Sequence, residues 1–159
     1  MMNVFHEMVY KESRCEPQVL AHGFYHGRNY YVVSFGTYPC AYIDVSDLWG
    51  KTWEEQKYLE NVLEDTIDCH GKMNYSDTEL VVEDKTGWYI GWDYDHSTDY
   101  NGNIPYKSLA KKWTTSEIVS ECKGVIDQIE GLVKELTKKI SGTTFQIVEP
   151  KMAKEEADA

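Results

Sequence analysis

The spacing of apolar residues along the chain predicts strands first and a long helix last. Residues 19–45 are rich in β-branched and aromatic side chains and are interrupted by two turn signals, HGRN (26–29) and GTYP (36–39). Because HGRN suits a tight hairpin turn, strands should flank it, and CAYIDVS (40–46) should form a third strand with alternating apolar positions.

Two more strands are expected in the middle of the chain. ELVVE (79–83) and GWYIGWDY (87–94) are separated by Asp84-Lys85-Thr86. Side chains alternate along a strand, so Trp88, Ile90 and Trp92 should share one face.

Two segments carry helical periodicity. The first follows the capping-box pair Thr52 and Glu55, and His70-Gly71 is a stop signal beyond it. The second follows the pair Thr114 and Glu117, and its wide apolar stripe is what a helix covering a sheet needs. The same spacing also allows a homodimer seam through residues 115–140. Gly142 is the expected C-cap of this helix.

These elements predict an α+β fold. An antiparallel sheet of about five strands should be packed by one long C-terminal helix and a shorter middle helix. Residues 1–149 should form a single domain, with a short last strand near residues 145–148, since a chain of this length can bury a core of its own. The tail, residues 150–159, lacks apolar periodicity and should be disordered.

Charge is distributed unevenly along the chain. The net charge is −11, and residues 44–99 alone hold fifteen Asp or Glu against four Lys. Such a field repels nucleic acid and attracts basic surfaces, although a solvated acidic face that keeps the protein soluble is an equally simple interpretation. The acidic residues that we expect to meet a partner are Glu54, Glu55, Glu60, Glu64, Asp65, Asp68, Glu83 and Asp84.

Composition also bears on the cellular compartment. No apolar run approaches the length of a membrane span, and the first residues lack the apolar segment of a signal peptide. The four Cys residues are scattered, with no CxxC pair, which is typical of reduced thiols. We therefore expect a cytoplasmic protein.

Polar residues that could form a binding site gather near the predicted strand ends. The candidate ligand-binding residues are His70, Tyr75, Asp93, His96 and Asp99. Two imidazoles with carboxylates suffice for a divalent metal, but the spacing D-x-D-H-x-x-D matches no standard zinc or calcium loop. Since Asp and His often cap turns, a structural role is the alternative, and no resident cofactor is expected.

Two other chemistries are weaker alternatives. Cys40 could be a nucleophile with His70 as base and Asp93 as orienting group, but a Cys within a strand is more often a core residue. Aromatic side chains could also stack on a nucleotide, although large aromatics on a strand usually form core. The aromatic candidates are Trp88, Tyr89, Trp92, Tyr94 and Tyr100.

Four segments occur in an order that resembles a known family: GTYPCAYIDV, CHGKMNYS, GWYIGWDYDHSTDY and KKWTTSEIVSECKGVIDQIEGL. The family consists of small proteins of Firmicutes genomes, phages and mobile elements, without an established activity, and its pattern is HPCAY, HGGLTYS, GFDxAHxGD and a WTTEEI helix. The resemblance covers about residues 24–136. The matching positions are Pro39, Cys40, Ala41, Tyr42, His70, Gly71, Tyr75, Ser76, Gly91, Asp93, His96, Asp99, Trp113, Thr114 and Thr115.

The chain departs from the family pattern at three positions. Tyr38 stands where the pattern has His, Lys72 where it has Gly, and Trp92 where it has Phe. The change at Tyr38 removes an imidazole that a metal site could have used.

These observations lead to two main hypotheses. The first is a non-enzymatic phage or mobile-element protein that inhibits a host or defence factor, as an anti-CRISPR does, by presenting its acidic surface to a basic one. The surface would mimic nucleic acid, and the partner would be a nucleic-acid-binding protein. The alternative is a pocket protein that sequesters or hydrolyses a small nucleotide-like ligand, or holds a metal, through His70, Asp93 and His96. A scaffold or dimer without a ligand is the third possibility.

Overall fold

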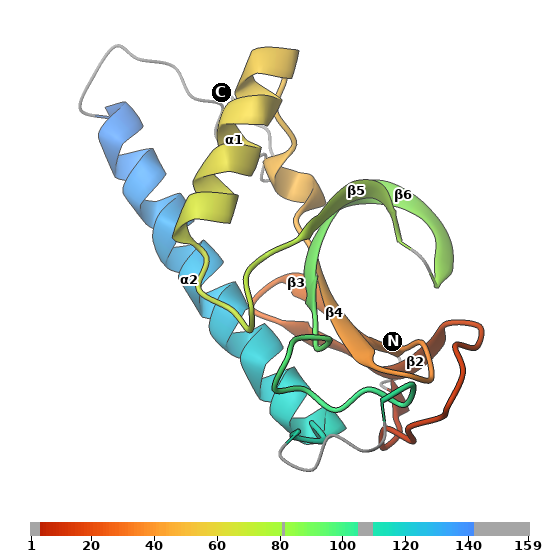
Figure 1. Ribbon diagram of the computed structural model, residues 1–159. Coiled ribbons are helices and arrows are strands. Elements are labelled where there is room, and N and C mark those ends of the chain that lie inside the picture. Colours follow the sequence, from red (N-terminus) through yellow and green to blue (C-terminus); the bar gives the residue numbers. More distant parts are fainter. Residues whose placement is uncertain (1–3, 81, 105–109, 142–159) are drawn as a thin grey trace.

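The sheet and its two covering helices make an α+β fold in the computed structural model, which describes residues 4–80, 82–104 and 110–141 (Figure 1). The sheet is antiparallel, with the strand order β1-β2-β3-β4-β6-β5. The strands are β1 (Val4–Phe5), β2 (Gln18–Tyr25), β3 (Arg28–Ser34), β4 (Pro39–Asp44), β5 (Tyr75–Leu80) and β6 (Glu83–Asp93). The helices are the 3₁₀ turn η1 (Ser46–Leu48), α1 (Trp53–Thr66) and α2 (Thr115–Ser141). Five longer strands with the two-residue β1 confirm the predicted fold class.

The β2–β3 hairpin turns where the sequence predicts. His26 and Gly27 both have positive φ, +47° and +84°, which is the backbone that a tight two-residue hairpin turn requires. Gly36, at φ +89°, serves the next reversal, and β4 follows in register with Val33 opposite Cys40. The first three predicted strands are therefore confirmed.

The β5–β6 hairpin is confirmed, but its turn is not where we expected it. The reversal falls between Leu80 and Glu83, which are paired, and Asp84-Lys85-Thr86 lie inside β6. The strand can hold these polar residues because their side chains are exposed at the tip of the hairpin. In consequence β5 starts at Tyr75, earlier than predicted.

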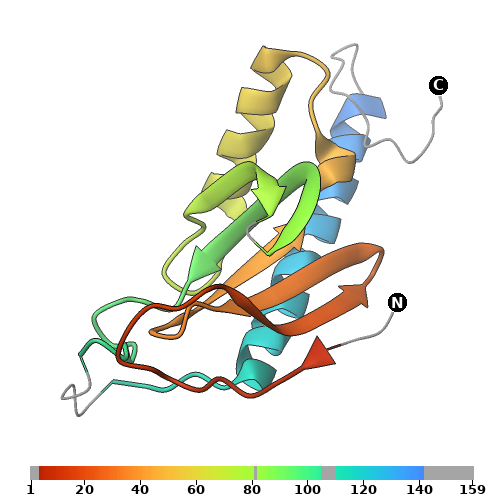
Figure 2. The same ribbon diagram turned by 90° about the vertical axis from the view of Figure 1, so that its right-hand side faces the viewer.

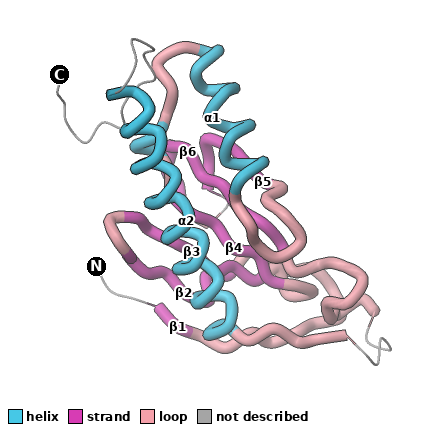
Figure 3. The backbone as a smooth tube through the Cα atoms, turned by 90° about the vertical axis from the view of Figure 1, so that its left-hand side faces the viewer, coloured by secondary structure: helices cyan, strands magenta, loops and turns pink. Residues whose placement is uncertain are grey.

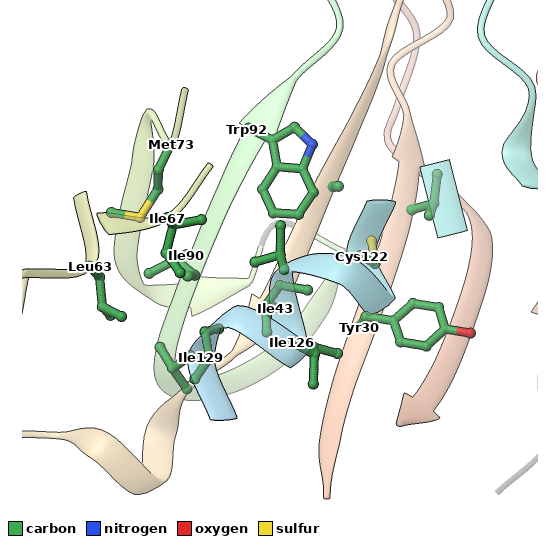
Figure 4. Packing of buried hydrophobic residues seen from close by; sticks show 14 of the residues in the cluster. Tyr30, Ile43, Leu63, Ile67, Met73, Ile90, Trp92, Cys122, Ile126 and Ile129 are labelled. Atoms are coloured by element: carbon green, nitrogen blue, oxygen red, sulfur yellow. The ribbon is translucent and has the colours of Figure 1, made fainter. Parts of the chain in front are cut away.

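The main core lies between the sheet and the helices (Figures 3 and 4). Trp88, Ile90 and Trp92 face it from β6, as the alternation predicted. The stripe of α2 covers them with Ile118, Cys122, Val125, Ile126 and Ile129, all of which are fully buried. This part of the apolar stripe therefore packs against the sheet of the same chain. A homodimer through α2 stays a prediction.

Helix α1 begins as predicted and ends earlier than expected. The Thr52 hydroxyl accepts a hydrogen bond from the backbone N–H of Glu55, so the predicted cap is present. The helix ends at Thr66, because the backbone becomes extended at Ile67 and the following residues are held by α2. The N–H groups of Asp68 and His70 donate to Gln128 and Glu121 there. His70 is thereby fixed in a loop against α2.

The opposite face of the sheet carries a second cluster of buried residues. Figures 1 and 2 show the β5–β6 hairpin bending away from the helices and back across this face. The cluster is rich in tyrosine and consists of Tyr31, Val33, Phe35, Cys40, Tyr42, Leu80 and Tyr89.

Some predictions concern segments outside the described residues. These are the C-cap at Gly142, the last strand near 145–148 and the tail 150–159. Within the described part of the chain, neither helix has the length and apolar character needed to traverse a bilayer.

The cap of α2 allows a direct test of the fold. The Thr114 hydroxyl accepts from the Glu117 N–H, and the Glu117 carboxylate accepts from the Thr114 N–H. We expect Thr114→Ala to lower the free energy of unfolding by about 1 kcal/mol in urea titrations, because the Glu117 N–H loses its acceptor. Ser116→Ala, an exposed neighbour, is the control. Equal effects of the two changes would contradict the cap.

Candidate functional site

The candidate site forms where four parts of the chain meet around Asp99. The loop after α1 brings His70, the end of β6 brings Asp93, the following loop brings His96 and Asp99, and the approach to α2 brings Trp113. The ladder from β4 to β6 aligns Cys40 with Asp93, and the Tyr94 N–H donates to the Pro39 carbonyl just beyond it. The site therefore starts at a fixed end of a central strand.

Asp99 is the centre of the hydrogen bonds at this site. Its Oδ2 lies 2.8 Å from His70 Nε2 and 3.0 Å from His96 Nδ1, and it accepts the His96 backbone N–H at 2.9 Å. Its Oδ1 accepts the Trp113 indole N–H at 2.8 Å. Yet the Asp99 side chain is only 1% exposed. A buried carboxylate thus holds together groups that lie up to 29 residues away in the chain.

The pKa of Asp99 follows from this environment. Burial on its own raises the pKa of a carboxyl, but the hydrogen bonds from His70, from the His96 N–H and from Trp113 outweigh it and set the pKa below its usual value. Asp99 is therefore ionised at neutral pH and can only accept. Each imidazole nitrogen that faces it must then carry a proton while no ion is present.

His96 sits between two carboxylates. Its Nδ1 faces Asp99, and its Nε2 lies 3.7 Å from Asp93 Oδ1. Asp93 is itself positioned, because its Oδ2 accepts from the Asn74 side chain at 2.8 Å and its Oδ1 accepts from the Asp95 N–H. His96 is partly exposed, so this imidazole is the part of the cluster that solvent reaches.

His70 is held by aromatic rings. Its ring stacks on Tyr94 with 4.5 Å between centroids and 10° between planes, and Trp113 meets its edge at 4.9 Å. These contacts fix the plane of His70 from the side of the main core. The imidazole is thus presented to Asp99 in one orientation.

The turn after His70 is tightly constrained. Gly71 has φ +73°, and a Cβ there would lie 2.2 Å from the His96 ring, so only glycine fits. Lys72 has φ +120°, a backbone that side chains other than glycine rarely adopt. Lys72 is also one of the positions where the chain departs from the family pattern, which has Gly.

The distances in this cluster suit a metal ion. One ligand atom from each of His70, His96 and Asp99 lies within 4.8 Å of the other two. The separations of 2.8 and 3.0 Å from Asp99 Oδ2 to the two imidazoles are hydrogen-bond lengths. Ligand atoms around a tetrahedral zinc ion lie about 3.3 Å apart, so shifts of a few tenths of an ångström would bring these two pairs to that spacing. Asp93 would then accept from the other ring nitrogen of His96, as outer-shell carboxylates do.

Four of the five predicted ligand-binding residues come together here. His70, His96 and Asp99 are in mutual contact, and Asp93 lies beside His96. Tyr75 lies elsewhere: its ring meets Tyr42 on the second face of the sheet, and its hydroxyl donates to the Glu79 carbonyl. The structure therefore gives Tyr75 a packing role in the sheet.

The structure also separates the weaker alternatives from the site. Cys40 packs in the second cluster, where burial and the nearby Asp93 raise the pKa of its thiol to about 12, so it is not a thiolate at neutral pH. Trp88, Tyr89, Trp92 and Tyr94 are fully buried core residues and offer no face to a base. Tyr100 instead packs against Tyr10 and Lys112.

Sequence reasoning missed several residues of the site. Trp113 and Asn74 complete it, and neither was predicted to bind a ligand from its local pattern. Tyr94, expected only as a stacking face for a nucleotide, stacks on His70 instead. The only signal was the family resemblance, which includes Trp113 and Gly71 among its matching positions. Those positions do lie together with His70, Asp93, His96 and Asp99 in the fold.

Comparison with known proteins identifies no relative of this chain. No family model, no curated protein and no solved structure matches the chain. The family resemblance accordingly stays a prediction.

The predicted acidic surface follows α1 and the β5–β6 hairpin. Glu54, Glu64, Asp65, Asp68 and Asp84 are exposed, whereas Glu55, Glu60 and Glu83 are partly buried. Some of these carboxylates have local partners: Glu55 accepts from the Lys51 N–H, Glu60 from Ser76, and Glu83 pairs with Lys85. The exposed members on α1 are the ones available to a partner.

The strained backbone at Lys72 gives a prediction about the loop that holds His70. We expect Lys72→Gly to raise the free energy of unfolding by about 1 kcal/mol, because glycine removes the cost of the positive φ. Lys72→Ala removes the same charge but keeps the strain, so it should give no gain. Chemical denaturation of both variants checks this. A gain with Lys72→Ala alone would contradict it.

Proposed function

We propose that the protein binds a divalent transition-metal ion at His70, His96 and Asp99. The observation that carries the proposal is the gathering of these three side chains within 4.8 Å around a carboxylate with 1% exposure. The donors around Asp99 stabilise its charge in the metal-free protein. An ion bonded to Asp99 and to both imidazoles would replace the two imidazole donors, while the His96 and Trp113 N–H groups stay on the carboxylate.

The ligand types favour particular metals. Two imidazoles and one carboxylate suit zinc, iron or a related transition metal better than magnesium or calcium, which prefer oxygen ligands alone. Three protein ligands also leave coordination positions free, as in catalytic rather than structural metal sites. Because His96 is partly exposed, water or a small anionic ligand could take a free position.

The outer residues have defined roles in this proposal. With Nδ1 of His96 bonded to an ion, the ring proton would sit on Nε2, which faces Asp93 Oδ1 at 3.7 Å. The Trp113 indole N–H stays on Asp99 Oδ1 and holds the carboxylate in place. Both residues would act as positioning residues.

Metal binding is the test of the proposal. We expect calorimetric titration with Zn²⁺ to give one ion per chain, and Co²⁺ to give visible absorption bands of a bound ion. His96→Ala should weaken binding by more than about 100-fold, and Asp93→Asn by about 10- to 100-fold, the usual effect of losing an outer-shell partner. His26→Asn is the control, because this exposed imidazole lies in the β2–β3 turn.

Thermal unfolding of each variant without metal separates binding from folding. Asp93 is partly exposed, so its variant should retain the wild-type melting temperature. The proposal fails if the wild-type chain takes up no metal, or if it binds as tightly with His96→Ala as without.

A second candidate function is inhibition of a host or defence factor by the acidic surface. It is supported by the charge of α1, which has five acidic residues (Glu54, Glu55, Glu60, Glu64 and Asp65) and one basic residue, Lys57, a net of −4. Exposed acids at this density draw in basic surfaces such as those of nucleases and speed their association at low salt. The resemblance to proteins of phages and mobile elements agrees with such a role. The chain would then act in the bacterial cytoplasm.

A phage plating assay tests the second candidate. Expression of the chain should raise the plating efficiency of a phage on a host that carries a CRISPR nuclease. The triple change Glu64→Lys, Asp65→Lys and Asp68→Lys should abolish the rise, because it reverses the charge that steers the partner. His96→Ala should leave it intact. Protection that survives the charge reversal would refute this candidate.

A further inference from the structure

The acidic helix α1 and the segment before it also expose large aromatic side chains. Trp53 is 72% exposed, Trp49 46% and Tyr58 44%. They lie within ten residues of one another in the chain. Aromatic residues are normally buried, and exposed ones are typical of interaction surfaces.

Helix geometry explains why α1 cannot bury these side chains in its own core. Gln56, Leu59 and Leu63 are the buried residues of α1 and define its inner face. With about 100° per residue, Glu54, Tyr58 and Asp65 lie opposite the inner face, whereas Trp53 lies on the flank of the helix that also carries Lys57. The exposed side of α1, from Trp53 round to Tyr58, thus combines aromatic rings with carboxylates, and we call it the outer face.

Trp53 already receives a cation within the chain. The Lys57 ammonium lies 5.6 Å from the centre of the Trp53 ring. A cation over the face of Trp gains attraction from the ring's negative face, and an arginine of a partner can do the same with a larger contact. The neighbouring carboxylates can pair with further basic groups.

We propose that the outer face of α1, with Trp53 as its anchor, docks onto an arginine- or lysine-rich surface of another protein. This inference deepens the second candidate function and rests on it. Charge complementarity selects the occupant: a second copy would bring the same carboxylates against this face, and nucleic acid would bring phosphates. A basic surface instead matches both the carboxylates and the rings.

The expected pattern of energies is that of an interface with one anchor. Trp and Arg contribute most to protein interfaces, and truncation of an anchor costs on the order of 2 kcal/mol, which is about 30-fold in affinity. Exposed charges around it mainly affect the association rate and its salt dependence. Trp53 and the acids should therefore respond differently to mutation.

A fluorescein-labelled nona-arginine peptide is the probe, and fluorescence anisotropy is the measurement. In about 50 mM salt the wild-type chain should bind the peptide, and at about 300 mM binding should weaken strongly, since exposed charges are then screened. Trp53→Ala should weaken binding by 10-fold or more. Phe24→Ala removes a similarly exposed aromatic side chain, 64% against 72% for Trp53, from β2 and should leave binding unchanged.

The variants distinguish the anchor from the acidic surface. If Trp53→Ala binds as the wild type does, while Glu64→Gln with Asp65→Asn binds poorly, the anchor is refuted and the acidic surface stands. If the wild-type chain does not bind the peptide even at low salt, both are refuted. Light scattering tests a second copy as occupant: a dimer that Trp53→Ala converts to a monomer would overturn the proposed partner. Trp53 is exposed, so thermal unfolding should confirm that its variant folds.

Discussion

A carboxylate that is removed from water must be surrounded by donors, and Asp99 imposes this requirement on the whole end of the fold around it. Among the described residues, its donors include two imidazoles, one backbone N–H and one indole N–H. Losing any one would leave a buried charge under-satisfied, which is far more costly than losing an exposed contact. The loop after α1, the loop after β6 and the start of α2 are therefore coupled through one side chain.

This coupling explains several local features. Glu121 on α2 holds the backbone of His70, and Gly71 is the only residue that lets the chain pass the His96 ring. The end of β6 supplies Asp93, whose position is set by its pairing with β4. The site is thus built from loops, but each loop is tied to a regular element, which is how binding groups are commonly held in place.

The fold was largely predictable, because periodicity reports which side of an element is buried. The stripe of α2, the alternation of β6 and the capping box of α2 were read from the sequence and are present. At α1 the Thr52 cap is present, but Glu55 accepts from the Lys51 N–H and not from Thr52. The β5–β6 turn was misplaced because Asp84-Lys85-Thr86 resembles a turn locally, whereas strand pairing with β5 overrides that preference. The end of α1 was missed because its cause lies on α2, far away in sequence.

The residues of the candidate site could be predicted only in part from the sequence. His70, Asp93, His96 and Asp99 stood out as polar groups near strand ends, but nothing local indicated that Asp99 would be buried or that Trp113 would donate to it. Tyr75 lies away from the other four residues because β5 begins at this residue and turns its side chain toward the second cluster. Contacts between distant segments are not encoded in local spacing.

Nitrogen NMR of the imidazole rings would test most directly whether Asp99 organises this site. For neutral rings in the metal-free protein, the account predicts a proton on Nε2 of His70 and on Nδ1 of His96, because an ionised Asp99 accepts from both. Added Zn²⁺ should shift these same two nitrogens. The opposite tautomers in the metal-free protein, or shifts confined to other histidines on adding Zn²⁺, would contradict it.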